Sequence, residues 1–301
     1  MRVAVIAPPW VPVPPQGYGG TELVLDTLCR ELVRQGHDVL LCATADSRCP
    51  VERRWTYGEA LGIAAIAPGP ELRHALDAHE AIRSWGADIV HDHTLSGPHL
   101  AVGREGPPVI TTNHGPFDGD LAALYRRLAD RVPVLAISHH QAATAGDIPI
   151  AAVIHHGIDV AGVPIGSGAA GHVLFLGRMS PDKGVHVAIE VARGAGVPLK
   201  IAAKMSEKDE REYFDACVRP LLGGGDVEYL GEVGGSAKRA LLADALCLLN
   251  PIRWPEPFGM VMVEALAVGT PVLATPCGAA PEIVDDGVTG FLRSDVASLT
   301  A

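Results

Sequence analysis

The sequence is poor in aromatic residues, in paired cysteines and in long apolar runs. Phe, Trp and Tyr make up 5% of the 301 residues, whereas hydrophobic residues make up 48%. Packing by Val, Ala and Leu between many Gly- and Pro-containing turns is typical of α/β domains. None of the six cysteines belongs to a C-x-x-C pair, so we expect buried free thiols in a reduced, cytoplasmic protein. No apolar run reaches the length of a membrane span.

Positive charge is also scarce. Lys and Arg number 24 against 35 Asp and Glu, which gives a formal net charge of −11. Because binding to a nucleic-acid backbone needs a basic face, we expect no nucleic-acid partner. An apolar segment starts directly after Arg2, so we expect neither a cleavable signal peptide nor integral membrane association.

The first glycine-rich loop lacks two common nucleotide-binding signatures. Gly17-Tyr-Gly19-Gly20-Thr21-Glu22 has no glycine at the sixth position of G-x-G-x-x-G, and no Gly-Lys-Ser/Thr follows it. An NAD fingerprint and a P-loop are therefore disfavoured. Glycines at a helix start can still approach a phosphate or a sugar closely, and Thr21 is the expected N-cap. The alternative is a tight strand-to-helix turn without a ligand.

Strand and helix patterns alternate along the chain. Apolar runs predict strands at 3–7, 38–43, 87–91, 108–112, 134–137, 151–155, 172–176, 199–203, 227–230, 246–249, 271–274 and 289–292. Helical patterns include 70–85, 119–130, 138–145, 185–193, 207–221 and 236–245. This order predicts parallel sheets that are covered by helices on both faces.

A segment rich in small residues, 161–171, interrupts this alternation. Since 301 residues are many for one core, the sequence predicts two domains. We expect an N-terminal domain at 1–160, a linker at 161–171 and a C-terminal domain at 172–301. Two doubly wound domains that face each other would form a central cleft, in which ligands bind beyond the carboxyl ends of the strands.

Two carboxylates flank a turn rich in proline and glycine near the end of the chain. Glu256-Pro-Phe-Gly259 leads into an apolar run that starts at Met260 and contains Glu264. Gly259 allows a close approach of backbone to ligand, and the first N–H groups of a helix favour an anion. A phosphate and a sugar would satisfy both features. The simpler alternative is an ordinary helix start with Glu256 on the surface.

A basic turn follows the first predicted strand of the C-terminal domain. Gly177-Arg178-Met-Ser-Pro-Asp-Lys183-Gly184 places two cations at the carboxyl end of that strand. Arg offers a planar fork and Lys a point charge, and together they suit a diphosphate. The alternative is a solvated turn with two exposed cations.

Two further patterns could bind a metal, but each has a simpler interpretation. Asp118-Gly-Asp120 matches D-x-D, yet it opens a helix, and an N-cap role is favoured. Histidines recur at predicted strand ends, namely at His91-Asp-His93, His139-His140 and His155-His156. Neutral imidazoles could bind zinc, but no zinc-site spacing accompanies them. Hydrogen bonding in the cleft is favoured, and no metal is expected. His91 and His93 are candidates for the acceptor side.

Seven motifs follow one another along almost the whole chain. They are Gly19-Gly20-Thr-Glu22, Gly36-His37-Asp-Val, His156-Gly-Ile-Asp159, Gly177-Arg178…Lys183-Gly184, Glu256-Pro-Phe-Gly259…Glu264-Ala, Gly269-Thr-Pro-Val272 and Gly287-Val-Thr-Gly290-Phe291. In this order they resemble the retaining glycosyltransferases of family 4, which have the GT-B fold. The resemblance implies metal-independent transfer of a hexose from a nucleoside-diphosphate sugar to an acceptor that the sequence does not identify. UDP-glucose is the preferred donor, and GDP-mannose and UDP-N-acetylglucosamine remain open.

The resemblance also implies a role for each matching residue. Arg178 and Lys183 would bind the donor diphosphate, Glu264 the ribose and Glu256 the donor sugar. His114 matches the active-site histidine beside the sugar hydroxyls. Further implied donor contacts are Gly19, Gly20, the backbone of Phe258, Gly259 and Met260, and the loop that contains Val233, which would meet the base.

The implied chemistry leaves Glu256 without a nucleophilic role. The anomeric bond would break toward an oxocarbenium-like centre while Arg178, Lys183 and a helix N-terminus stabilise the departing diphosphate. A glycosidase-like carboxylate pair is the competing account, although hydrolysis does not require the two cations. Two non-transferring functions also remain open: a sugar-nucleotide 2-epimerase and a catalytically silent nucleotide-sugar binding module.

The sequence departs from the family pattern in two places. His156 stands where the family usually has Asn, which makes the local hydrogen bonding uncertain. The sequence ends at Ala301, where family members usually continue through helices of which the last crosses back to the first domain. We therefore expect these C-terminal crossover helices to be missing.

Overall fold

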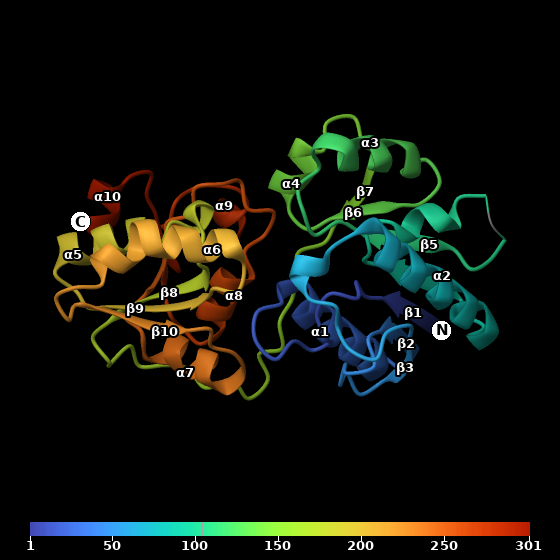
Figure 1. Cartoon of the computed structure of the whole chain (residues 1–301), viewed down its shortest axis with the longest axis horizontal. Helices are drawn as coiled ribbons and strands as arrows, with labels where there is room; N and C mark the ends of the chain where they lie inside the picture. The colour runs from blue at the N-terminus through green and yellow to red at the C-terminus, as the bar shows by residue number, and fades with distance from the viewer. Residues whose placement is uncertain (104) are drawn as a thin grey trace. The chain divides into compact units, whose positions relative to one another are not determined.

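Two parallel sheets organise the chain in the computed structural model, which describes residues 1–103 and 105–301 (Figure 1). Each sheet belongs to one of two units, Met1–Gly157 and Ile158–Ala301. Two units, each with its own parallel sheet, agree with the predicted pair of doubly wound α/β domains.

The first unit contains a seven-stranded sheet in the order β3-β2-β1-β4-β5-β6-β7. Its strands are β1 Arg2–Ile6, β2 Asp38–Ala43, β3 Glu52–Trp55, β4 Ile89–Asp92, β5 Val109–Thr112, β6 Val134–Ala136 and β7 Ile150–Val153. Its α-helices are α1 Gly20–Arg34, α2 Pro68–Trp85, α3 Gly119–Leu128 and α4 His139–Thr144. The strand order reverses between β1 and β4, and ligands of such sheets bind at the carboxyl ends beside such a reversal.

Alternate residues of β1 pack on opposite faces of this sheet. Val5 belongs to the cluster that contains Leu25 of α1, whereas Ile6 belongs to the cluster that contains Ile82 of α2. Because side chains of a strand alternate in direction, an apolar run without polar positions is what a sheet covered on both faces requires.

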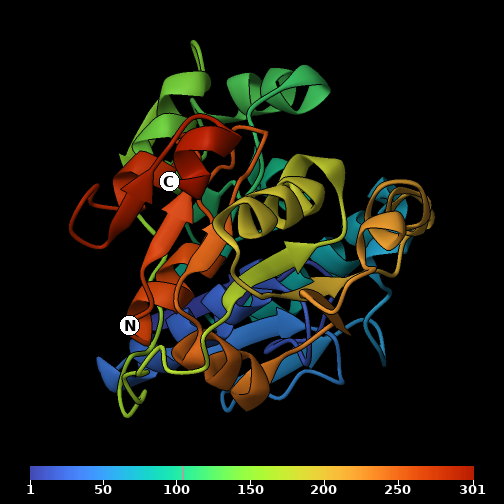
Figure 2. The same cartoon turned by 90° about the vertical axis from the view of Figure 1, so that its left-hand side faces the viewer.

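The second unit contains a six-stranded sheet in the order β10-β9-β8-β11-β12-β13. Its strands are β8 Val173–Arg178, β9 Leu199–Lys204, β10 Val227–Gly231, β11 Leu248–Asn250, β12 Val272–Ala274 and β13 Gly290–Leu292. Its α-helices are α5 Val185–Ala195, α6 Lys208–Tyr213, α7 Gly235–Asp244, α8 Met260–Ala267, α9 Ala280–Ile283 and α10 Val296–Thr300. Figures 1 and 2 show α5 and α7 on opposite faces of this sheet.

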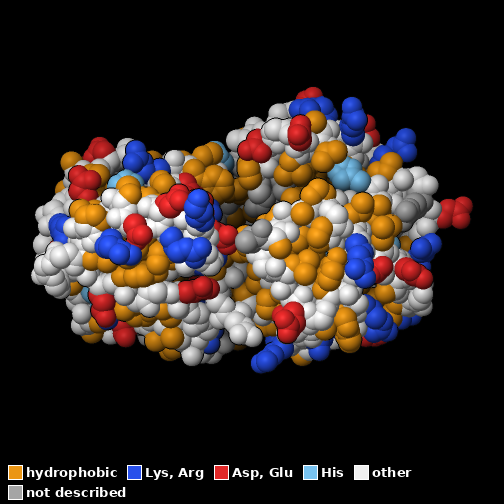
Figure 3. Space-filling view, viewed as in Figure 1, with side chains coloured by type: hydrophobic (Ala, Val, Ile, Leu, Met, Phe, Trp, Pro, Cys, Tyr) orange, Lys and Arg blue, Asp and Glu red, His pale blue; other side chains and the backbone are white. Residues whose placement is uncertain are grey.

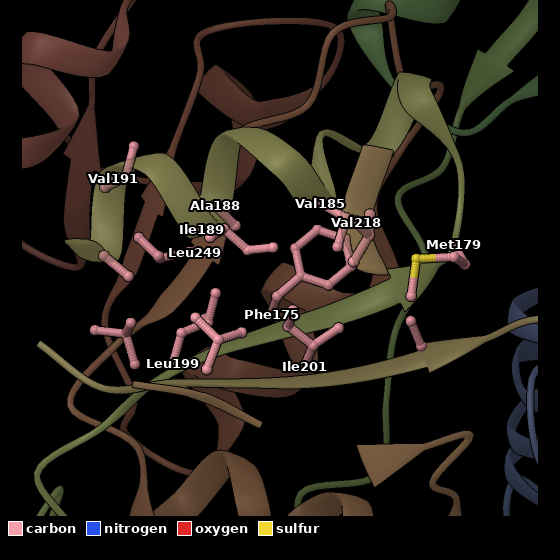
Figure 4. Close-up of a cluster of buried hydrophobic side chains, with 14 of the residues drawn as sticks. Phe175, Met179, Val185, Ala188, Ile189, Val191, Leu199, Ile201, Val218 and Leu249 are labelled. Carbon is pink, nitrogen blue, oxygen red and sulfur yellow. The ribbon is translucent and has the colours of Figure 1, made fainter. Parts of the chain in front are cut away.

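The core under α5 is formed by aliphatic and aromatic side chains from the strands. Figure 4 shows Phe175 and Ile201 directed from the sheet toward Val185 and Ile189 of α5. Phe175 is 1% exposed, so its truncation to Ala would cost about 3–5 kcal/mol. This packing holds the carboxyl end of β8 and the start of α5, where the basic turn lies.

Two local predictions were wrong. Thr21 is not the N-cap of α1, because the helix begins at Gly20 with Gly19 as its cap. A Cβ at Gly19 would lie 2.7 Å from Pro15 Cβ, so close packing rather than a side-chain cap determines this start. The predicted helix 207–221 continues from α6 as a π-helical turn and a 3-10 turn, and Pro220 lacks the N–H that a regular helix needs.

The strand β3 was not predicted from the sequence. Its sequence, Glu-Arg-Arg-Trp, has no apolar run, and it lies at the edge of the sheet beside β2. Edge strands carry charged residues that discourage pairing with other chains.

The predicted linker 161–171 contains no helix or strand, but backbone bonds attach it to the second unit. The Gly166 N–H donates to the Val268 carbonyl at 2.7 Å, and the Gly168 N–H donates to the Ala243 carbonyl at 3.3 Å. In the part of the chain that the structure describes, no helix combines the length and apolar content needed to cross a membrane. Charged side chains of both signs are interspersed on the face of the second unit that Figure 3 shows.

Candidate active site

The basic turn begins where β8 ends. Arg178 is the last residue of β8, and its guanidinium donates to Asp182 Oδ2 at 3.2 Å. Lys183 ends the following 3-10 turn, Pro181–Lys183. Gly184 then adopts φ +74°, and a Cβ there would overlap the carbonyl oxygen of Pro251. Glycine is therefore required at this position for the turn to lie against the segment that leads to Glu256.

Lys183 and Glu256 form an ion pair, although 73 positions separate them in sequence. The ammonium of Lys183 donates to Glu256 Oε2, and the two side chains are 13% and 17% exposed. The indole N–H of Trp254 donates to the same oxygen at 2.9 Å. Lys183 Nζ also lies 5.4 Å from the centre of the Trp254 ring. One carboxylate oxygen is thus held by two donors of different charge.

Backbone contacts fix the position of Glu256 as well. The Ala279 N–H donates to the Glu256 carbonyl at 2.9 Å. Gly278 has φ +64°, and a Cβ there would overlap the backbone N and O of Glu256. The segment 278–279 therefore packs directly on the Glu256 backbone, which only a glycine at 278 permits.

The helix α8 begins four residues after Glu256. Gly259 is its N-cap with φ +104° and offers no side-chain oxygen to the first helical N–H groups. Such N–H groups, together with the helix dipole, favour an anion at this end. Because Lys183 is paired with Glu256, the structure brings one of the two predicted cations to the segment that leads into α8.

Glu264 has a partner that the sequence did not reveal. Lys238 of α7 donates to Glu264 Oε1 at 2.5 Å, with side-chain exposures of 20% and 13%. The pairing requires α7 to pack on α8, and no local pattern around Lys238 signals it. Val233, in the loop before α7, packs against the same core as α7 and α8, and Phe258 is buried.

In the first unit, four histidines form a row that we call the histidine row: His91, His93, His114 and His156. Successive ring centres lie 4.0, 5.1 and 5.1 Å apart. His93 Nδ1 and His114 Nε2 share a hydrogen bond of 2.9 Å, and His114 Nδ1 and His156 Nε2 share one of 3.3 Å. Both ring nitrogens of His114 therefore bond other histidines, and the unusual His156 accounts for one of these bonds.

Burial keeps the histidine row neutral. It lowers the pKa values of His91 and His156 to about 4. It lowers those of His93 and His114 well below the usual 6.5, and the neighbouring imidazoles add to the effect. Two acids of the same unit shift the opposite way, because burial raises the pKa values of Glu22 and Asp92 to about 7.

The other positions of the first unit that the sequence singled out lie at the starts of helices. Asp118 occupies the N-cap position of α3, as predicted, but its side chain makes no capping hydrogen bond. Gly19 and Gly20 lie at the start of α1. The roles of Gly19, Gly20 and His114 toward a donor stay predictions.

Comparison with known sequences gives two family matches that follow the two halves of the chain. The family described as Glycosyltransferase Family 4 matches residues 18–161. The family described as Glycosyl transferases group 1 matches residues 170–297.

Individual proteins are similar over nearly the full sequence. A phosphatidyl-myo-inositol mannosyltransferase of Mycolicibacterium smegmatis is 28% identical over 97% of this chain and 80% of its own length. The crystal structure of AviGT4, a glycosyltransferase involved in avilamycin A biosynthesis, has a TM-score of 0.69 and 28% identity over 99% of this chain and 86% of that one. Anabaena Alr3699/HepE in complex with UDP-glucose has a TM-score of 0.74 and 20% identity over 100% of this chain and 88% of that one.

Proposed function

Because the chain belongs to the family 4 glycosyltransferases and has the GT-B fold, we propose that it transfers a hexose from a nucleoside-diphosphate sugar, with retention of configuration and without a metal. UDP-glucose is the proposed donor. The donor would bind the second unit at the carboxyl end of β8 and the start of α8.

The Lys183–Glu256 pair beside the start of α8 is the observation that carries this proposal. In the structure each of these cations is matched by a carboxylate: Arg178 by Asp182, Lys183 by Glu256 and Lys238 by Glu264. A diphosphate would draw Lys183 away from Glu256, since phosphate oxygens are strong acceptors for an ammonium. Binding would thereby free the Glu256 carboxylate from Lys183, so that it can accept a hydrogen bond from the donor sugar.

The same groups would act in the bond-breaking step. As the anomeric bond breaks, negative charge grows on the diphosphate, and Arg178, Lys183 and the α8 N-terminus would stabilise it. This arrangement supplies the leaving-group charge compensation that a metal provides elsewhere. Glu256 would position the sugar rather than attack it, so the acceptor would enter on the face that the diphosphate leaves.

Two observations bear on the donor, and they favour different sugars. Alr3699/HepE was crystallised with UDP-glucose, whereas the mycobacterial relative is named a mannosyltransferase. Our preference for UDP-glucose remains part of the proposal, and the acceptor is left unspecified.

A thermal-shift screen with UDP, GDP, UDP-glucose, GDP-mannose and UDP-N-acetylglucosamine tests donor binding. Nucleotide release is then measured with a panel of hydroxyl acceptors, with and without EDTA, and the anomeric configuration of the product is read by NMR. We expect a shift with UDP and UDP-glucose and EDTA-resistant transfer with retention. Formation of a 2-epimer, hydrolysis alone, or binding without turnover would each contradict the proposal.

A further inference from the structure

Trp254 is a polar contact of Glu256 that none of the sequence motifs includes. We propose that its indole N–H is a positioning group for Glu256, which keeps the carboxylate in place when Lys183 turns to the donor diphosphate. This inference rests on the proposed function. It assigns Trp254 no direct contact with the donor.

The geometry of the Glu256 carboxylate carries the inference. Both Lys183 and Trp254 donate to Oε2. Within the part of the chain that the structure describes, no residue donates a hydrogen bond to Oε1. Trp254 thus fixes the carboxylate by one oxygen and leaves the other for a sugar hydroxyl. The backbone of Glu256 is already held by Ala279 and packed against Gly278, so the side-chain torsions are what remains to be restrained.

The need for such a restraint follows from burial. The Glu256 side chain is 17% exposed, and a carboxylate with that exposure is costly to leave without a donor. Once Lys183 binds a phosphate, the uncharged indole can stay on Oε2 without competing for the diphosphate. A second cation in its place would not have this property, because the diphosphate would attract it too.

Replacement by Phe separates the hydrogen bond from the packing of the ring. Trp254→Phe keeps an aromatic face beside Lys183 and removes the N–H donor. Trp55→Phe, at a position of the first unit that is 57% exposed, is the matched control. For each variant we would measure the melting temperature, the dissociation constant for UDP by calorimetry, and kcat and KM for transfer.

We expect Trp254→Phe to lower kcat about ten- to a hundredfold, the usual range for a hydrogen bond to a charged group. The UDP dissociation constant should stay within about twofold of the unaltered protein, since Lys183 is intact. In a Glu256→Gln background, Trp254→Phe should have little further effect on kcat. The indole N–H resonance of Trp254, assigned by its absence in the variant, should stay protected from exchange at saturating UDP.

Three results would overturn the inference while the proposed function stands. They are an unchanged kcat in Trp254→Phe, a loss of UDP affinity as large as the loss of kcat, and losses that simply multiply in the double variant. Absence of turnover in the unaltered protein with every donor would instead overturn the proposed function, and this inference with it.

Discussion

Glu256→Gln and Lys183→Ala should change UDP affinity in opposite directions, although the two residues form one ion pair. Glu256→Gln removes the charge that holds Lys183 in the ligand-free protein and keeps the size of the side chain. Lys183 can then bind the diphosphate without first leaving a carboxylate. Lys183→Ala removes the cation and leaves the Glu256 carboxylate beside the incoming diphosphate.

The exposure of the pair sets the expected size of both effects. At 13% and 17% exposure the charges are neither fully buried nor free in solvent, and a hydrogen bond of this kind is worth about 1.5–3 kcal/mol net. Lys183→Ala should therefore weaken UDP binding about ten- to a hundredfold. Binding of UDP must first break the Lys183–Glu256 pair, and Glu256→Gln removes this cost. The cost is smaller than the full interaction of Lys183 with the diphosphate, so we expect UDP binding to tighten by up to about tenfold.

Calorimetric titration with UDP at low and at physiological salt measures both effects. Lys208→Ala is the matched control, because Lys208 belongs to the same unit and pairs with Glu212 at 3.4 Å, with exposures of 88% and 67%. It should leave the affinity unchanged. If Glu256→Gln weakened UDP binding as much as Lys183→Ala does, Glu256 would support nucleotide binding directly and the competition argument would be wrong.

Three further predictions concern stability and the nucleoside end of the site. Between about pH 4.5 and 6.5 the histidine row is neutral when folded and protonated when unfolded, whereas the two buried acids (pKa about 7) are protonated when folded and ionised when unfolded. For these six groups the unfolded chain binds four protons and the folded unit two, so together they should make the free energy of unfolding rise with pH by up to about 2.7 kcal/mol per pH unit. Burial also lowers the pKa values of His74 and His99 in the same unit, which adds to the rise. Urea titrations at several pH values would measure it, and a flat or falling profile would contradict the assignment. Gly278→Ala should lower the melting temperature by several degrees because its Cβ would overlap the backbone of Glu256, whereas Gly287→Ala, with φ +81° and open space, should cost only backbone strain; equal losses would refute the packing argument. Lys238→Met should weaken binding of UDP several-fold, because it removes the partner that holds the Glu264 carboxylate in place for the ribose. The affinity for inorganic pyrophosphate, measured by calorimetry, should not change. A loss of affinity for both ligands would place Lys238 on the phosphates.

Most of the fold could be predicted from the sequence because its signals are local. Apolar runs of strand length, such as 38–43, lie in strands at the predicted positions. A position that needs glycine can also be predicted when the glycine lies in a turn between a strand and a helix, as Gly259 does. The failures at Thr21 and in 207–221 have local causes too, namely a closely packed glycine and a proline, but their effect depends on what the backbone packs against.

The polar contacts of the site could not be predicted in the same way. The partners Lys183 and Glu256, like Lys238 and Glu264, come from different elements, and which elements adjoin is a property of the sheet order and helix packing. The sequence placed His91, His93 and His156 at strand ends, and the resemblance singled out His114. Neither indicated that β4, β5 and β7 would align these rings into one hydrogen-bonded row. Trp254 was not predicted, because a single Trp before Pro255 belongs to no recognisable motif.

The matched charges of the donor site bear on product release as well as on binding. On the proposed mechanism the departing UDP carries more negative charge than the bound donor did, so Arg178 and Lys183 hold it more tightly after transfer. A site with unpaired cations would then retain its product. Return of Lys183 to Glu256 offsets part of that attraction, because the pair forms again only when the diphosphate leaves. The carboxylate that weakens nucleotide binding in the ligand-free protein would therefore speed UDP release, and Glu256→Gln should show stronger inhibition by UDP alongside its slower transfer.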